Sequence, residues 1–269
     1  MNSFKKIMAA AVLGAAMTGT AQAGVVNVMG VIWDTDATGI DQDFTGRFSY
    51  GQYFQNSASQ FINPANVVAG DELAIYGEFT AWNGVETNPG SVLGGLVGEF
   101  CPSCEVTFGF SGLKADGAGS FTFDDAVINL YVDHNPNFSP ASTSLVDYAT
   151  YATDGALFLS LKVDDIDFAA TGGAGNQYLS GSLALRLSVQ GGPAAEYFDT
   201  NYFNDGALVW DLSTSSSAIF EEIGNNTGVW AATSTGQLKG DTNVVPEPTS
   251  LALMSLGLLG FGAAYRRRI

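Results

Sequence analysis

Basic residues are scarce across the middle of this 269-residue chain, and their scarcity excludes several functions. Residues 24–245 contain five basic residues against 26 acidic ones, which gives this stretch a net charge of about −21, compared with −17 for the whole chain. Such a surface repels nucleic acids and anionic lipids, so no nucleic-acid partner is expected. It remains soluble through self-repulsion and attracts divalent cations or basic partners.

Catalytic motifs are also lacking. His134 is the only histidine, and sequence spacing provides it with neither an orienting carboxylate nor a nucleophile. Gly109-Phe110-Ser111-Gly112 only approximates the G-x-S-x-G pattern of a nucleophile elbow. With so many acidic residues, a pair spaced for glycoside hydrolysis can arise by chance. The sequence therefore predicts a protein that is not an enzyme, without any catalytic residue.

Long uncharged apolar runs occur at the two ends of the chain. The first, within residues 1–23, begins after Lys5 and Lys6 and is followed by Ala21-Gln22-Ala23, so the segment has the three parts of a secretory signal peptide. About 14 apolar residues span roughly 21 Å as a helix, which is short of a hydrocarbon core of about 30 Å. We expect cleavage and a mature chain that starts near Gly24.

The other end combines a proline motif, an apolar segment and a basic cluster. Pro246-Glu247-Pro248 precedes residues 250–265, which carry no charge, and Arg266-Arg267-Arg268 follows. The prolines stop a helix from extending backward, and snorkelling arginines extend its reach, so residues 250–265 are predicted to form a transmembrane helix. By the positive-inside rule the arginines stay in the cytoplasm and the preceding domain lies across the membrane.

This arrangement over residues 246–269 resembles the PEP-CTERM sorting signal, found on exported proteins of Gram-negative bacteria that also make extracellular polysaccharide. The resemblance implies that the tail helix is held transiently in the inner membrane and is processed by a membrane transpeptidase of the exosortase type. It also implies a final location at the cell surface or in the extracellular matrix. Whether the tail is removed from the mature protein stays open.

Export makes a disulfide the expected state of Cys101 and Cys104, the only two cysteines. A C-x-x-C pair is redox-active when a helix follows it, but the sequence after Cys104 is typical of a strand. The pair could also form half of a zinc site, yet there is no second cysteine pair. A small local disulfide in a turn is therefore predicted.

Short strand-like runs fill residues 24–232. Residues 120–124 and 182–189 alternate strictly between apolar and polar positions, so each run has one dry face and one wet face. Helical periodicity is limited to residues 144–151 and 216–223. About nine strands without alternating long helices predict an all-β domain over residues 24–232, an antiparallel β-sandwich with a jelly roll as one form of it. The polar residues 233–245 predict a flexible linker.

Acidic loops offer candidate calcium ligands. Residues 34–43 place oxygen atoms at alternate positions around a glycine, loosely like a calcium loop, and residues 133–137 have D-x-N-x-N spacing with Phe138 in place of the glycine. Aspartate and asparagine are also ordinary turn residues, so the alternative is a set of turns without an ion. The candidate ligands are Asp34, Asp36, Asp41, Asp133, Asn135 and Asn137.

A second resemblance involves Tyr76-Gly77-Glu78-Phe79-Thr80 and residues 119–133, which are similar to proteins of the flocculation-associated PEP-CTERM group. Members of that group are exported, β-rich, without known catalytic residues, and implicated in retaining cells within a polysaccharide floc. The resemblance implies a non-catalytic surface or matrix protein associated with exopolysaccharide in biofilm or floc formation.

Two alternative functions stay open. One is a carbohydrate-binding module, in which exposed aromatic rings would stack on sugars; the other is a polysaccharide-modifying glycoside hydrolase, which needs two carboxylates facing each other across a cleft. The candidate rings, which could equally belong to the core, are those of Trp33, Trp82, Trp210 and Trp230.

Overall fold

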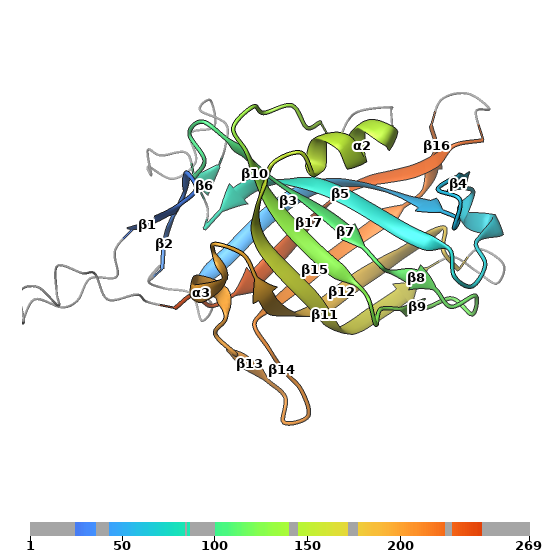
Figure 1. Ribbon diagram of the computed structural model, residues 1–269. Coiled ribbons are helices and arrows are strands. Elements are labelled where there is room, and N and C mark those ends of the chain that lie inside the picture. Colours follow the sequence, from blue (N-terminus) through green and yellow to red (C-terminus); the bar gives the residue numbers. More distant parts are fainter. Residues whose placement is uncertain are drawn as a thin grey trace, which may run out of the picture. The chain divides into compact units, whose positions relative to one another are not determined.

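The fold is a closed barrel of antiparallel strands (Figure 1). The computed structural model describes residues 25–35, 43–83, 85–86, 100–139, 145–171, 177–223 and 228–243, and in this part of the chain eight strands line the barrel. Each strand pairs with the next along the chain, and the last pairs with the first to close the ring. In order they are β3 (Phe44–Gln55), β5 (Glu72–Trp82), β7 (Glu105–Ser111), β10 (Val127–Asp133), β11 (Ala156–Ala170), β12 (Ser180–Gly191), β15 (Leu212–Ile219) and β17 (Trp230–Gly240).

Short strands and short helices accompany this ring of eight strands. The hairpin of β1 (Val25–Val28) and β2 (Val31–Asp34) precedes it, and the hairpin of β13 (Phe203–Asn204) and β14 (Val209–Trp210) projects from it (Figure 1). Four short strands extend the wall: β4 pairs with β3, β6 and β8 pair with β5, and β9 pairs with β8. The bounds of the others are β4 (Phe61–Ile62), η1 (Pro64–Asn66), β6 (Val85–Glu86), β8 (Lys114–Ala115), β9 (Phe121–Thr122), α2 (Leu145–Ala152), α3 (Ala195–Phe198) and β16 (Glu221–Glu222).

Aromatic side chains fill the interior. At one end, Trp82 meets Phe44 with ring centroids 4.8 Å apart, and Trp33 from β2 stacks on Phe198 of α3 at 5.6 Å. At the other end, Phe121 packs edge-on against Tyr178 at 5.4 Å. An eight-stranded barrel is just wide enough for side chains to fill, so these rings form the hydrophobic core.

The predicted all-β class is confirmed, but the predicted β-sandwich is wrong, because the sheet closes into a barrel. A strand with one apolar face suits a sandwich and a barrel equally, so alternation could not distinguish them. Closure depends on β17, which includes residues 233–240 of the predicted flexible linker 233–245. The linker prediction is therefore wrong over these residues, and the compact unit runs from Val25 to Asn243.

Small residues are the reason why the sequence did not predict most of β17 as a strand. Its inward positions include Gly236 and Gly240, where an added Cβ would lie 2.4 Å from the Phe48 ring and 2.3 Å from Leu212. The large side chains of β3 and β15 fill this space, so β17 needs little apolar sequence of its own. The strand therefore resembles a polar linker in the sequence.

The two helical expectations had different outcomes. A helical turn was possible within residues 144–151, where α2 is observed; the other segment, residues 216–223, instead contains the end of β15 and the whole of β16. The predicted signal peptide, residues 1–23, and the predicted apolar helix, residues 250–265, lie outside the described residues. Within the described ranges, no helix has the length and apolar character needed to cross a membrane.

Helix α2 packs on the outside of the barrel and builds a second, smaller core there. The ring of Tyr148 lies directly over Gly51 of β3, and Thr107 of β7 donates a hydrogen bond to the Ala152 carbonyl at 2.9 Å. Phe138 and Leu145 are buried in the same cluster. The absence of a side chain at Gly51 is what lets the helix approach the sheet.

We predict that Gly51→Ala lowers the free energy of unfolding by about 1–3 kcal/mol, the usual cost of overpacking. The new Cβ would lie 2.3 Å from the Tyr148 ring, so α2 must move. Urea denaturation of the purified protein measures the change. Gly191→Ala is the matched control, because its Cβ would meet nothing within 4 Å. In a Tyr148→Ala background the cost of Gly51→Ala should largely disappear; an undiminished cost there would contradict the packing argument.

Candidate functional site

The barrel wall is interrupted between β15 and β17. The two strands pair from Leu212 and Gly240 to Ser216 and Gly236, and the same register resumes only where Glu221 of β16 pairs with Ala231. Between these points, residues 217–220 and 232–235 have no backbone ladder joining them in the described strands. We call this interval the seam. It is a local interruption of the pairing between β15 and β17.

Hydroxyl groups replace part of the missing ladder. The Ser217 carbonyl accepts a hydrogen bond from Ser234 Oγ at 2.5 Å and another, from inside the barrel, from the Tyr50 hydroxyl at 3.4 Å. Burial raises the pKa of the Tyr50 phenol, although hydrogen bonding by Ser216 and Ser234 offsets part of this effect. The Tyr50 phenol therefore stays protonated and able to donate at neutral pH.

Outside the seam lies an open groove of about 840 Å³, which we call the seam groove. It brings together segments far apart in the sequence, and its lining mixes hydroxyls, two carboxylates and aliphatic groups. The residues that characterise it are Ser182, Ser217, Ile219, Glu221, Glu222, Ile223, Thr233 and Ser234.

A second hollow of about 540 Å³ continues along β15, β17 and β3, and we call it the trough. Ser217 lines both hollows, so the seam groove and the trough meet at that residue. The polar residues that line the trough are Arg47, Thr80, Ser215, Ser216, Ser217, Thr235 and Gln237.

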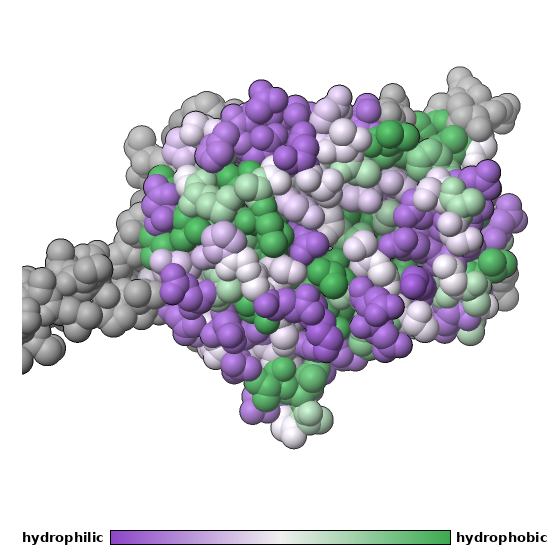
Figure 2. Space-filling view, viewed as in Figure 1, coloured by the Kyte–Doolittle hydropathy of each residue, from purple (hydrophilic) through white to green (hydrophobic). Residues whose placement is uncertain are grey.

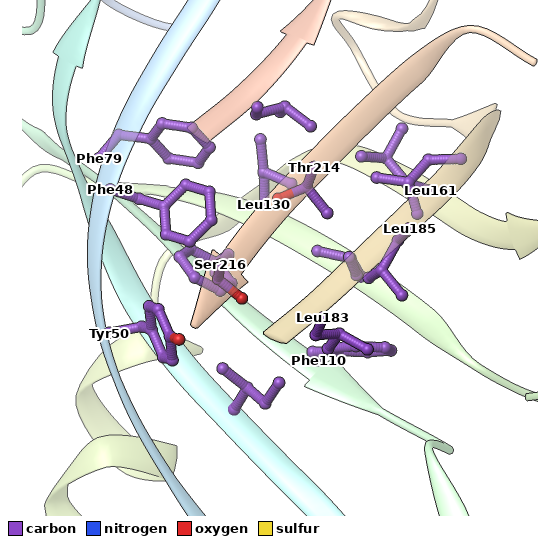
Figure 3. Close-up of a pocket in the computed structure, with 15 residues that line it drawn as sticks. Phe48, Tyr50, Phe79, Phe110, Leu130, Leu161, Leu183, Leu185, Thr214 and Ser216 are labelled. Atoms are coloured by element: carbon purple, nitrogen blue, oxygen red, sulfur yellow. The ribbon is translucent and has the colours of Figure 1, made fainter. Parts of the chain in front are cut away.

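The barrel interior offers much less room. Figure 3 shows its central cavity, about 40 Å³, enclosed by side chains such as Phe48, Phe110 and Leu185, with Thr214 and Ser216 as polar exceptions. A neighbouring cavity of about 30 Å³ shares Ser216 with it and shares Ser217 with the seam groove. Each cavity has space for a water molecule or two, not for a sugar ring. Of these four hollows, only the two outer ones have room for a sugar ring.

An aromatic stack lies at the base of the projecting hairpin, beside β12. Trp210 stacks on Phe203 with centroids 5.4 Å apart, Tyr202 meets Phe203 at 5.0 Å, and the Arg186 guanidinium lies 4.6 Å from the Trp210 ring centroid. Tyr202 and Val209 are 41% and 42% exposed, and the hairpin shows an apolar patch at the bottom of Figure 2. This stack is the nearest approach to a sugar platform that the sequence predicted.

The four tryptophans that could have formed a sugar platform lie in different environments. Trp33 and Trp82 are 3% and 1% exposed and belong to the core, so they cannot stack on a ligand at the surface. Trp210 lies in the aromatic stack, and Trp230 is half-buried in β17, opposite Glu222 of β16.

The candidate calcium ligands of residues 133–137 act as turn residues in the structure. Asp133 Oδ1 accepts from the Asn135 backbone N–H at 2.9 Å, and Asn137 Nδ2 donates to Asp154 Oδ2 at 3.2 Å. The Asn137 N–H donates to Glu105 Oε1 at 3.0 Å. Among the described residues, no group of three or more acidic, cysteine or histidine side chains is arranged to hold a metal ion.

The other candidate calcium loop, residues 34–43, lies mostly outside the described residues. Asp36, Asp41 and the side chain of Asp34 lie outside the described residues, so calcium at that loop stays a prediction. Sequence analysis missed Glu105, which lies directly opposite Asp133 across β7 and β10. Only the register of this strand pair brings the two together, and the sequence did not predict that pairing.

Cys101 and Cys104 lie at disulfide distance in a turn before β7, with Cα atoms 5.1 Å apart. A strand follows them, as expected, rather than the helix that a redox-active pair needs. His134 is exposed beside this turn, with Nδ1 3.4 Å from the Ser103 carbonyl. Its described contacts are those of a surface loop.

Two half-buried carboxyl groups have raised pKa values. Burial, together with the charge of Glu105, raises the pKa of Glu78 on β5 to about 7. Burial, together with the neighbouring Asp241 carboxyl, raises the pKa of Asp43 to about 7, although hydrogen bonds from Thr242 oppose the rise. The Thr242 backbone N–H donates to Asp43 Oδ1 at 2.7 Å, so Asp43 joins the start of β3 to the end of β17.

We predict that Glu78→Gln stabilises the protein at pH 8 by about 1–2 kcal/mol and gives no gain at pH 4. The pKa of Glu78 is higher in the folded state than its ordinary value of 4.5, so the native state binds the proton more tightly. The stability that this carboxyl contributes is present below pH 4.5 and is lost as the pH rises to about 7. Urea denaturation across this range, with the exposed Asp125→Asn as control, measures the effect. A gain independent of pH would contradict the linkage.

Comparison with known proteins identifies only the C-terminal end. Residues 244–268 match the family model described as the PEP-CTERM protein-sorting motif, which confirms the resemblance carried by Pro246-Glu247-Pro248 and Arg266-Arg267-Arg268. Neither a curated protein nor a solved structure matches the chain. The motif marks an exported protein of Gram-negative bacteria that is directed to the cell surface and processed by a membrane enzyme of the exosortase type.

Proposed function

We propose that this chain is a non-catalytic protein of the cell surface or extracellular matrix that associates with exopolysaccharide in biofilm or floc formation. The observation that carries the proposal is the seam groove, about 840 Å³ of open, hydroxyl-lined surface on an exported barrel. Sorting by the tail would bring this surface to the place where the polysaccharide accumulates.

The lining of the seam groove suits a sugar polymer. Hydroxyl and carboxylate groups can exchange hydrogen bonds with sugar hydroxyls, and the aliphatic groups of Ile219 and Ile223 can cover the apolar face of a ring. Ile219 is 67% exposed, which leaves its side chain accessible for such a contact. The hollow is open and continues into the trough, so a chain could pass along it without ending there.

The acidic residues of the groove favour binding over hydrolysis. Glu221 and Glu222 both border the groove, but they are consecutive residues of β16, so their side chains diverge instead of facing one another across the hollow. A glycoside hydrolase instead needs two carboxyl groups that face one another about 5–9.5 Å apart across the scissile bond. This arrangement supports a binding role rather than a catalytic one.

A dedicated carbohydrate-recognition module is the second candidate. The aromatic stack of Tyr202, Phe203 and Trp210 favours it, since exposed rings beside an arginine are a common way to hold a sugar. In that case Tyr202→Ala should abolish binding of a single defined oligosaccharide on a glycan array, whereas polymer association through the groove should survive it.

For the tail, we predict that replacing Pro246, Glu247 and Pro248 with alanine leaves the protein in the inner membrane. The motif is the part of the tail that the sorting enzyme would have to recognise, while the apolar segment would still hold the chain. Cell fractionation followed by immunoblotting measures the distribution. Pro136→Ala, at an exposed proline outside the tail, is the matched control and should be released normally. Unchanged release of the triple variant would refute the sorting assignment.

For the groove, we predict that Thr233→Trp lowers association with matrix polysaccharide at least tenfold, because a large ring at this exposed position fills the hollow. Co-sedimentation with polysaccharide extracted from the matrix of the producing bacterium measures it. Ser111→Trp places the same ring at the exposed end of β7 and should have no effect. Equal loss in both variants, or loss in neither, would contradict a binding role for the seam groove.

A further inference from the structure

Strand β15 differs from the rest of the ring in its charge. Of the eight ring strands it is the one without a charged residue, and five of its side chains carry a hydroxyl group. Ser215 and Ser217 are exposed and two residues apart, so both belong to the outer face of the barrel. Ser217 lines both outer hollows and Ser215 lines the trough. The strand therefore presents uncharged hydroxyls where the two hollows meet.

Neighbouring strands extend this surface. Ser182 of β12 lies opposite Ser217, and Gln237 of β17 lies opposite Ser215. Residues directly opposite in an antiparallel ladder share a face, so these side chains lie side by side. We call this surface, together with the two hollows on it, the polar track. Its exposed, uncharged polar side chains, which make no hydrogen bond to another described residue, are those of Ser182, Ser215, Ser217, Thr233, Thr235 and Gln237.

Charged residues are few along the polar track. Among the described residues that line its two hollows, they are Glu221 and Glu222 in the seam groove and Arg47 in the trough. Charges of opposite sign thus lie in different hollows, with the uncharged residues of β15 between them. Neither sign dominates the track as a whole.

The polar track is much longer than one sugar ring. Ala231 lines the seam groove and Gln237 lines the trough, and this length of extended strand covers about 20 Å. Since the two hollows share Ser217, a ligand can continue from one into the other. A ligand that fills both hollows would have to be a chain.

We infer that the polar track binds an internal stretch of an uncharged polysaccharide, which crosses Ser217 and occupies both hollows at once. This inference rests on the proposed function and specifies its ligand. Sugar hydroxyls donate and accept hydrogen bonds, as do the serine, threonine and glutamine side chains of the track. Affinity would then depend on chain length, because a fragment that reaches only one hollow forgoes the contacts of the other.

Charged polymers fit the polar track less well. An acidic polysaccharide would be repelled by a domain with a net charge of about −21 and would meet Glu221 and Glu222 in the seam groove. A cationic polymer would be attracted more strongly to strands such as β11, which carries Asp164, Asp165 and Asp167. An uncharged chain is bound by hydrogen bonds and ring contacts, so salt should not weaken it.

The test uses matrix polysaccharide of the producing bacterium, separated by anion exchange into an uncharged and an acidic fraction and cut to graded lengths by partial hydrolysis. Isothermal titration calorimetry with the full mature protein measures the affinity for each fraction and length. We expect the uncharged fraction to bind independently of salt, with long fragments bound at least about tenfold more tightly than disaccharides.

Blocking one hollow at a time tests whether the two act as one site. Thr235→Trp fills the trough and Thr233→Trp fills the seam groove, and both positions are exposed. Each should lower the affinity for long fragments at least about tenfold and leave that for disaccharides within about twofold, because one hollow stays open. Ser111→Trp, at the exposed end of β7, is the matched control and should bind every length as the parent does.

A second variant guards against misfolding. Ser215→Ala/Ser217→Ala removes two exposed hydroxyls from β15 without adding bulk. It should weaken binding of long fragments severalfold, with an unchanged midpoint of thermal unfolding. Retained binding in this variant would overturn the placement of the ligand on β15.

Each alternative outcome has a definite meaning. Tighter, salt-sensitive binding of the acidic fraction would overturn the inference and leave the proposed function standing. An affinity independent of fragment length, or a loss in Thr233→Trp with none in Thr235→Trp, would do the same. Equal losses in Thr235→Trp and Ser111→Trp would also overturn the inference. Failure of both fractions to bind at any length would overturn the proposed function as well.

Discussion

The pairing of β17 with β3 is the interaction on which the rest of the structure depends. It runs without a break from Ala232 opposite Gln52 to Gly240 opposite Phe44, and it converts an open sheet into a ring. Without it, the aromatic interior would face solvent and two long strands would be left as edges. The same strand pairs with β15 over only part of its length. β17 therefore closes the barrel through β3 and leaves the seam on its other side, toward β15.

Contacts with the barrel extend beyond the end of the closing strand. Beyond Gly240 the chain remains attached: Thr242 is held by Asp43, and the Asn243 backbone N–H donates to the Tyr197 carbonyl at 2.7 Å. The Asn243 side chain adds bonds of 2.9 Å to the carbonyls of Glu196 and Asp199. The described contacts therefore reach Asn243, and the family match starts at residue 244.

Sequence reasoning recovered the features that are local and missed those that depend on pairing. The alternation at Leu183, Leu185 and Leu187 announces a half-buried strand because each inward position is large and apolar. In β17 the inward positions other than Leu238 are small, and Phe48 and Leu212 occupy the space at Gly236 and Gly240, so the strand leaves little apolar signal. The seam groove combines Ser182, Ser217 and Thr233, which only the ring order brings together. The tail could be identified because its meaning depends on order within one short segment.

A closed barrel limits how the protein can engage a polymer. The eight strands of the ring are each paired on both sides, so they leave no long edge strand for another chain, and contact would use the outer face, the loops, the short outer strands or a defect in the wall. The seam is such a defect, because residues 217–220 and 232–235 lack a ladder between them and several of them line a hollow open to solvent. Under the proposed function, sugar hydroxyls would supply donors and acceptors where the ladder is missing. The same irregularity that interrupts the wall would then provide hydrogen-bonding groups for a polymer at one place on the barrel.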